Sequence, residues 1–287
     1  MAVTQGRQTS LRRLRDQLKR MREERSLQQV EVAQKLDWST SKLIRIENGT
    51  VGISVTDLRA LTGIYDAPAG EVEHLVELVR QTKGRTWWSS YPTINAAYKN
   101  FIGFELDASR MLQYHLSIIP GLLQTQEYMR VLIPALRLEP TAQPALEDLY
   151  AVRIRRQREI VEAEEGADIT MLIDEAALRR PVGGPAVMRE QYRHLQRAAA
   201  SPRLTVAVLP LAAGPHAGLA GGFTIMEFAD DVDGDLLVQE NATGNILLQD
   251  QPELVESYRK AFEGMLAHAL RDERAVEFLE TLVQEQG

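Results

Sequence analysis

Four side chains that are suited to contacting a polar, charged surface lie within six positions of one another: Thr40, Ser41, Lys42 and Arg45. Short hydroxyls and long cations of this kind reach base edges and phosphate oxygens. Leu43 and Ile46 occupy intervening positions, so a helix here turns the apolar pair inward and the four polar side chains outward. The spacing predicts a surface for double-stranded DNA, and the alternative is a solvated face of an ordinary amphipathic helix.

The stretch that must position these residues runs from Ser26 to Gly49 and is predicted to form two short helices. Ser26 is the candidate N-cap of the first helix, with Gln29 completing a capping box. That helix is expected to end near Leu36, with Val30, Ala33 and Leu36 on one face. Ser39 is the candidate cap of the second helix, which is expected to stop at Asn48-Gly49.

Helices on both sides supply a small core for this pair. A basic helix is predicted over Leu11 to Arg25, and apolar positions continue from Ile53 to Tyr65 and from Ala69 to Thr82. The stretch SLQQVEVAQKLDWSTSKLIRIENG resembles an Xre/Cro-type helix-turn-helix domain. From this match we predict five helices over residues 8–82 and a set of DNA-contacting residues: Gln28, Gln29, Ser39, Thr40, Ser41, Lys42, Arg45 and Asn48.

Composition agrees with a two-domain globular chain. The 287 residues are 44% hydrophobic and 25% charged, and there is no Cys, which excludes disulfides and thiolate metal ligands. The net charge is -7, but residues 1–50 hold 11 Lys+Arg and 6 Asp+Glu, leaving an acidic remainder. No apolar run approaches the roughly 20 residues of a membrane span, so we expect a cytoplasmic protein without membrane contact. The five His are scattered, so we expect no metal and no cofactor.

Residues 83–99 are predicted to form an aromatic linker that contains Trp87, Trp88, Tyr91 and Tyr98. These rings either anchor the linker on the second domain, which we favour, or stack on bases. Residues 100–287 are predicted to be a helical and α+β regulatory domain with a mixed sheet of about four strands: 169–173, 204–209, 223–228 and 236–240. The turn signal at 230–234 favours a hairpin between the last two.

Two features of this second domain could carry chemistry. Asp174 and Glu175 adjoin at a strand end, with Arg179 just beyond, and invite either a catalytic reading or salt bridges at a strand-to-helix turn. His216 lies in the glycine-rich stretch Gly214 to Gly222, which lacks a phosphate-loop ending. His216 is a candidate ligand contact or proton donor, and the alternative is that the stretch is a flexible lid or a loop that needs positive φ angles. We predict a ligand or partner site at Asp174, Glu175, Arg179 and His216, with no catalytic residues.

A basic run, VRIRRQREI, contains Arg153, Arg155, Arg156 and Arg158. Salt bridges to nearby glutamates are favoured over a phosphate site.

The order of motifs resembles a larger family, the actinobacterial Xre-type, antitoxin-like regulators of the WhiJ kind. FIGFELDAS, IIPGLLQTQEYMR, VRIRRQ, IDEAALRRPVGGPAVMREQYRHL, VLPLAAGPHAGLAGGFTIMEF and AFEGMLAHAL carry the resemblance over residues 8 to 280. It implies transcription control and a small, adjacently encoded protein as a partner. We also expect a homodimer on a near-palindromic operator. The alternative is an enzyme with a hydrolase-like C-terminal domain and an appended DNA-binding domain.

Overall fold

The structure is a computed structural model that describes residues 6–49, 51–82, 84, 86–137, 140–230, 234–240 and 246–286. The chain divides into two compact units, Met1–Ser89 and Ser90–Gly287. The division falls inside the segment 83–99 that the sequence analysis treats as a linker. Within that segment, Trp87–Ser90 forms a 3-10 turn, and the rings of Trp87 and Trp88 meet edge to face.

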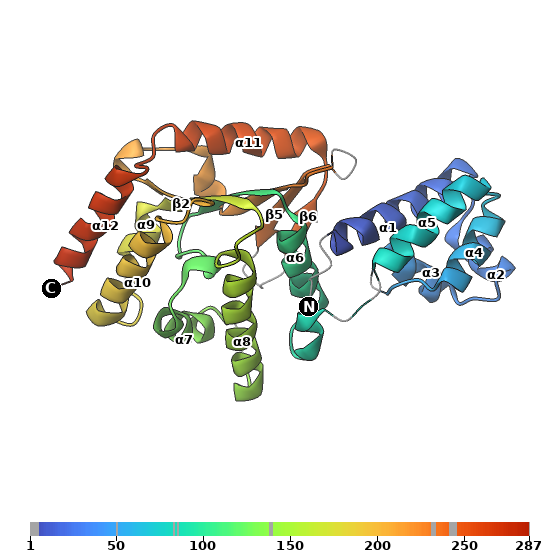
Figure 1. Ribbon diagram of the computed structural model, residues 1–287, viewed down its shortest axis with the longest axis horizontal. Helices are drawn as coiled ribbons and strands as arrows, with labels where there is room; N and C mark the ends of the chain where they lie inside the picture. The colour runs from blue at the N-terminus through green and yellow to red at the C-terminus, as the bar shows by residue number, and fades with distance from the viewer. Residues whose placement is uncertain are drawn as a thin grey trace. The chain divides into compact units, whose positions relative to one another are not determined.

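Five α-helices, as predicted, lie in the described residues of the N-terminal unit (Figure 1): α1 (Arg7–Glu24), α2 (Gln29–Lys35), α3 (Thr40–Glu47), α4 (Val55–Ile64) and α5 (Ala69–Gln81). Their apolar faces close one core that includes Leu18, Leu43, Leu58 and Leu75. Helix α1 begins four residues earlier than expected. The reason is tertiary, because Ser10 Oγ donates a hydrogen bond to Gln81 Oε1 of α5 at 2.9 Å.

Two local predictions for the helix pair are wrong. Ser26 adopts a left-handed conformation (φ 54) and does not cap α2. Gln28 is the N-cap instead, and its backbone N–H donates to Glu31 Oε2 at 2.8 Å within a capping box. Val30, expected on the buried face, is 47% exposed, while Val32 and Ala33 are buried. The buried face of α2 is therefore formed by Val32 and Ala33 and excludes Val30.

The C-terminal unit contains a mixed sheet of six strands in the order β3-β2-β1-β4-β5-β6. The strands are β1 (Arg110–His115), β2 (Asp168–Asp174), β3 (Leu204–Leu209), β4 (Phe223–Glu227), β5 (Leu236–Glu240) and β6 (Ile246–Gln249). Strands β1, β2 and β3 are parallel, and β4 to β6 continue antiparallel from β1. The mixed sheet and the β4–β5 hairpin pairing are confirmed, although turn residues 231–233 lie outside the described residues. Strands β1 and β6 were not predicted from the sequence.

Strand β1 was missed because it is a central strand that is covered on both faces. Met111 packs into the core on one side, and Leu112 and Tyr114 pack into the core on the other. A strand buried on both faces loses the alternation of apolar and polar residues that identifies a half-exposed strand. The polar Gln113 and His115 weaken the signal further.

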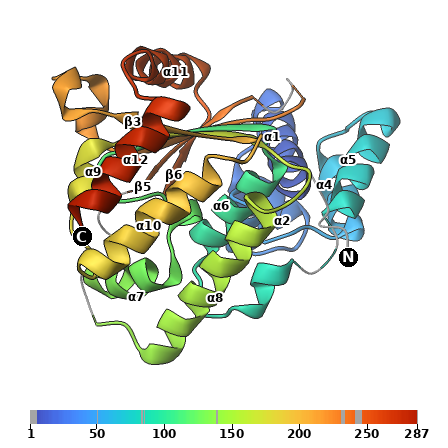
Figure 2. The ribbon, with the colours of Figure 1, turned by 60° about the vertical axis from the view of Figure 1, so that its left-hand side comes forward.

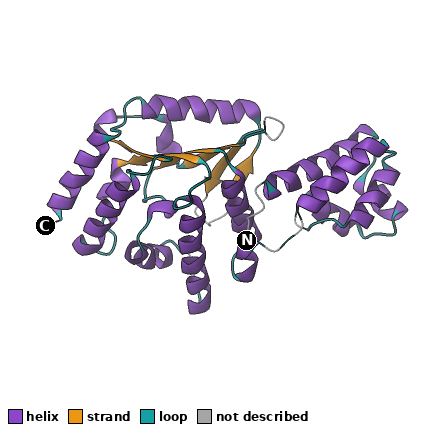
Figure 3. Ribbon diagram, viewed as in Figure 1, coloured by secondary structure: helices purple, strands orange, loops and turns teal. Residues whose placement is uncertain are grey.

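Helices cover both faces of the sheet (Figures 1 and 3). One face packs on α11 (Pro252–Leu266) through Val255, Phe262 and Met265. The opposite face packs on a layer of several helices: α6 (Ala96–Asp107), α7 (Gln126–Ala135), α8 (Gln143–Ile160), α9 (Glu175–Arg179), α10 (Pro185–Ala198) and α12 (Glu273–Glu285). Helices α10 and α12 lie side by side within this layer (Figure 2).

The distinctive PGLLQT segment is explained by buried amides that hold it in place. Gln191, which is fully buried, donates to Leu123 O at 2.6 Å and accepts from Thr125 N at 2.8 Å. Gln124 donates to Ile119 O at 2.7 Å and accepts from Arg153 Nη1 at 2.9 Å. These contacts satisfy backbone groups that a buried loop would otherwise leave unpaired.

The basic run on α8 forms ion pairs, as favoured. Arg155 pairs with Glu159 at 3.3 Å. Arg156 pairs instead with Glu105 of α6 at 2.5 Å, and neither side chain is more than 8% exposed. Tyr98 lies in α6, where its hydroxyl accepts from Arg156 Nη1 at 2.9 Å. This arginine therefore ties α8 to α6.

Candidate functional site

The outward surface of α3 carries most of the predicted DNA contacts. Ser39 caps the helix by accepting from Lys42 N at 3.2 Å, and Asn48 and Gly49 (φ 69) end it. Leu43 and Ile46 are buried, as expected. The exposed side chains on the other side are Ser41, Ile44, Arg45 and Asn48, with Thr40 half-buried. Helical geometry places these positions on one face, where they form what we call the α3 outer face.

Besides the helix caps, two of the predicted contact residues bond to other side chains of the N-terminal unit. Lys42 Nζ lies 3.0 Å from Asp57 Oδ1 and 3.6 Å from the centre of the Trp38 ring. Gln29 Nε2 donates to Glu47 Oε2 at 2.7 Å. By contrast, the side chain of Arg45 makes one hydrogen bond to the described residues, from Nε to Ser41 O of its own helix at 3.2 Å. Of the two cations on this helix, Arg45 is therefore the more available for contact with another molecule.

The orientation of α3 depends on a buried ion pair at its inner side. Glu47 is 4% exposed and accepts from Arg22 Nε at 2.7 Å and from Arg22 Nη2 at 3.0 Å. The hydrogen bond from Arg22 to Glu47 raises the pKa of Arg22 above its ordinary value. A guanidinium that binds a carboxylate through two nitrogens fixes direction as well as distance. The pair therefore holds α3 against α1, and Gln29 adds α2 to the same carboxylate.

The four candidate residues of the C-terminal unit meet at one edge of the sheet. Asp174 ends β2, and its Oδ2 lies 3.5 Å from His216 Nε2. Glu175 follows directly, and it pairs with Arg179 Nε at 2.5 Å and accepts from Leu211 N at 2.8 Å. Arg179 also reaches Glu285 at 2.9 Å. The structure thus brings together residues that the sequence offers only as separate features.

Tyr114 is a member of this site that sequence reasoning missed. Its hydroxyl donates to Asp174 Oδ2 at 3.0 Å, and its ring lies edge to face with that of His216 at 5.8 Å. Burial and the Asp174 carboxylate raise the pKa of Tyr114, so the phenol stays protonated and remains a donor. We call Tyr114, Asp174 and His216 the polar cluster. Recognition of β1 as a strand parallel to β2 would have been the signal for Tyr114.

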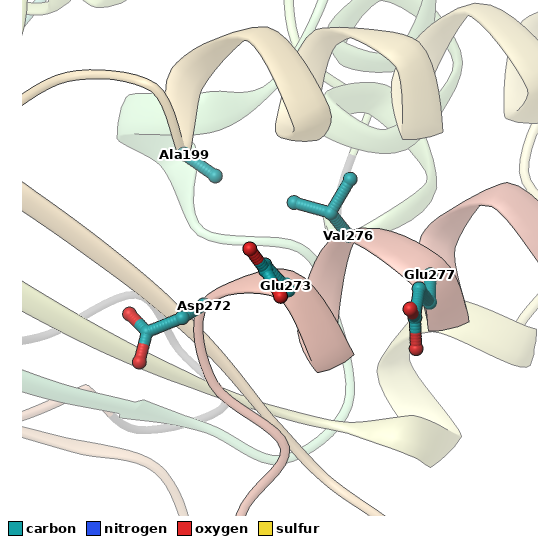
Figure 4. Close-up of a pocket in the computed structure, with 5 residues that line it drawn as sticks. All are labelled: Ala199, Asp272, Glu273, Val276 and Glu277. Atoms are coloured by element: carbon teal, nitrogen blue, oxygen red, sulfur yellow. The ribbon is translucent and has the colours of Figure 1, made fainter.

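A hollow of about 500 Å³ lies elsewhere, between the end of α10 and the start of α12 (Figure 4). It is lined by Ala199, Asp272, Glu273, Val276 and Glu277, none of which is a predicted site residue. Within the described part of the chain, no group of three or more His, Asp or Glu is arranged to hold a metal ion. No helix among those same residues is long and apolar enough to cross a membrane.

The five-helix unit with its α3 outer face defines a helix-turn-helix protein, and a helix-turn-helix domain matches residues 13–75. A domain of unknown function (DUF5753) matches residues 98–281, which is more than half of the chain. The chain therefore belongs to the DUF5753 family. No curated protein and no solved structure matches it. The helix-turn-helix domain suggests a DNA-binding regulator.

Proposed function

We propose that this protein is a sequence-specific, Xre-type transcriptional regulator that binds duplex DNA through α3. The observation that carries this proposal is the α3 outer face. Ser41, Arg45 and Asn48 are exposed there, on a helix whose opposite side is locked by the Arg22–Glu47 pair. Helix-turn-helix proteins insert such a helix into the major groove. Ile44 is 36% exposed between them and suits contact with a thymine methyl group.

Arg45→Ala tests this proposal. A duplex is first selected from a randomised pool with the wild-type protein. Loss of a base-contacting arginine then weakens binding to that duplex by about 1–3 kcal/mol. Titration of the labelled duplex at fixed salt measures the change, because phosphate contacts make the affinity salt-dependent.

Arg59→Ala is the matched control for Arg45→Ala. Arg59 is an exposed arginine of α4 that pairs with Glu73 at 2.8 Å, so its loss removes the same charge away from α3. Equal affinities of the two variants would contradict the assignment of α3 as the reading helix.

The small size of the DNA-binding unit favours a dimer. Residues 1–50 carry an excess of Lys and Arg, which suits phosphate contact, but a single domain of this size covers little DNA. We propose a homodimer on a near-palindromic operator, with half-site centres about 34 Å apart or a multiple of that distance. Light scattering of the DNA complex checks this, and a 1:1 complex at operator concentration contradicts it.

We further propose that the C-terminal unit is a binding module and not an enzyme, in a cytoplasmic, antitoxin-like regulator. Its sheet places Asp174, Glu175, Arg179 and His216 at one edge, which supports a ligand or partner site there. A small, adjacently encoded protein is the first candidate partner. Coupling would require that partner and DNA change each other's affinity by the same factor. Operator titrations with and without that protein measure the factor, and a value of one contradicts the coupling.

A further inference from the structure

The polar cluster lies where α/β sheets most often bind ligands. Strands β1, β2 and β3 are parallel, so their carboxyl ends share one edge, and Asp174 is paired with Leu209 in the register at that edge. Tyr114 lies near the end of β1, and His216 comes from the segment that follows β3. Ligands in such sheets bind in the crevice outside the carboxyl ends of the strands.

Hydrogen-bond accounting leaves one atom of the cluster without a partner. Asp174 is satisfied, because Oδ1 accepts from Ala176 N at 2.8 Å and Oδ2 accepts from Tyr114. His216 Nε2 lies 3.5 Å from Asp174 Oδ2, so we assign the proton of the neutral ring to this nitrogen. The other nitrogen, Nδ1, is buried and has no hydrogen-bond partner among the described residues. It is an acceptor that lacks a donor, and buried polar atoms of this kind are rare in folded proteins.

The charges around the cluster disfavour an anionic ligand. Asp174 and Glu175 are adjacent carboxylates. The nearby cation, Arg179, is already engaged by Glu175 and Glu285. A group that approaches His216 Nδ1 therefore meets an excess of negative charge, and it must donate a hydrogen bond. A hydroxyl or an amino group meets both conditions.

A glycine-bounded segment covers the cluster. Gly214 (φ 71) and Gly221 (φ 146) flank the 3-10 turn Ala217–Ala220, and both conformations favour glycine. Gly218 is buried, and a Cβ there would lie 2.3 Å from Tyr114 Cε1 and 2.8 Å from Met265 Sδ. The missing side chain lets the segment lie directly on the tyrosine ring. We call residues 214–221 the cover.

Apolar side chains stand exposed beside the cluster. Leu211 is 59% exposed and Leu219 is 56% exposed, the largest values among the large hydrophobic residues that the structure describes. Leu219 belongs to the cover, and Leu211 is tied to the site through the hydrogen bond from its N–H to Glu175. Solvent-exposed leucines in the two segments that contact a polar site suit a ligand with an apolar body.

We propose that the polar cluster binds a small, mainly apolar molecule whose hydroxyl or amino group donates a hydrogen bond to His216 Nδ1. The body of the molecule packs on Leu211 and Leu219. Because Nδ1 is buried, the cover, which carries His216 itself, shifts to expose this nitrogen. This inference rests on the proposed role of the C-terminal unit as a binding module and names its ligand class.

Three probes test the proposal in the full-length protein, each a linear chain of seven non-hydrogen atoms: n-hexanol, n-hexylamine and pentyl methyl ether, which has no donor. The ring nitrogens of ¹⁵N-labelled histidine are followed by NMR, and the His216 signals are assigned by their loss in His216→Ala. We expect the alcohol and the amine to shift the Nδ1 signal saturably. The ether, which can only accept, binds at least about tenfold more weakly. Leu219→Ser weakens the alcohol and the amine by a similar factor.

The outcomes separate the possibilities. Absence of a saturable shift up to the solubility limits, or equal binding of the ether, overturns the proposed site. Retained probe binding in His216→Ala, monitored by the remaining signals, assigns the histidine a structural role only and also overturns it. Binding to the selected duplex is measured on the same samples without probe. Intact DNA binding with no probe binding removes only the ligand site, and the converse result removes only the DNA-binding function.

Discussion

The α3 outer face and the polar cluster use similar side chains in opposite surroundings. On α3, Arg45 and Ser41 are exposed, and the described hydrogen bond of Arg45 stays within its own helix. In the cluster, Tyr114 and Asp174 are buried and bonded to each other across two strands. The α3 outer face is an exposed surface that the core behind it supports, whereas the polar cluster is itself part of a buried core.

The difference teaches how each site can be changed. An exposed side chain of the α3 outer face can be removed with little effect on folding, because it supports nothing behind it. A residue of the cluster also holds its neighbours, so its loss affects both binding and stability. Adjacent pairs of residues, one facing in and one facing out, allow this comparison to be tested within each unit.

The largest effect is expected from Glu47→Ala. The substitution leaves Arg22 buried without its carboxylate, and such a loss destabilises a protein by about 3–5 kcal/mol. The melting temperature of the N-terminal unit, followed by tryptophan and backbone signals, should decrease sharply. DNA binding should be lost as the unit unfolds.

Arg45→Ala is the outward-facing control for Glu47→Ala. It should change the free energy of unfolding by no more than about 0.5 kcal/mol while still weakening DNA binding. Similar melting temperatures for the two variants would refute the division between the inner and outer sides of α3.

Gly218→Ala is expected to cause the next largest decrease in the free energy of unfolding. The new methyl group has no room against the Tyr114 ring, so the cover must shift, and overpacking of this kind costs about 1–3 kcal/mol. Denaturant titration of the C-terminal unit measures the change. Leu219→Ser, one residue along and exposed, should stay within about 0.5 kcal/mol of wild type. An unchanged stability in Gly218→Ala would mean that the cover does not pack on Tyr114 in solution.

A smaller effect is expected on the stability of the C-terminal unit at acidic pH. Burial, with a further contribution from Arg156, lowers the pKa of His115 to about 4. An unfolded chain has a histidine pKa of about 6.5, so between these values the unfolded state binds more protons. The free energy of unfolding of the C-terminal unit should therefore be highest above about pH 6.5 and should decrease as the pH falls towards 4. We expect a decrease on the order of 1–2 kcal/mol, because the ring is not fully removed from solvent.

His115→Gln should flatten this pH dependence of the C-terminal unit, as followed by denaturant titration at a series of pH values. Burial also lowers the pKa of His194, so part of the acid sensitivity should persist in the variant. An identical slope in His115→Gln and wild type would exclude His115 as a cause.

Local signals in the sequence determined the helix-turn-helix. A serine N-cap, the apolar positions Leu43 and Ile46, and the Asn48-Gly49 stop each act within one or two turns, so they can be read without knowledge of any partner. The exposed α3 surface followed from them, whereas the five helices followed from the apolar positions of the flanking segments and from the helix-turn-helix resemblance. The same local reasoning placed four of the strands and singled out Asp174, Glu175 and Arg179 as one feature and His216 as another, and only the structure joined the two.

Only the tertiary structure decided which side chains remain available and which are used internally. Gln29 and Lys42 look like surface contacts in the sequence, but Glu47 and Asp57 engage them across helices. Tyr114 joins Asp174 from sixty residues away because β1 and β2 are parallel neighbours. No periodicity encodes such a contact. It arises when buried strands exclude water and their polar side chains must find partners in one another.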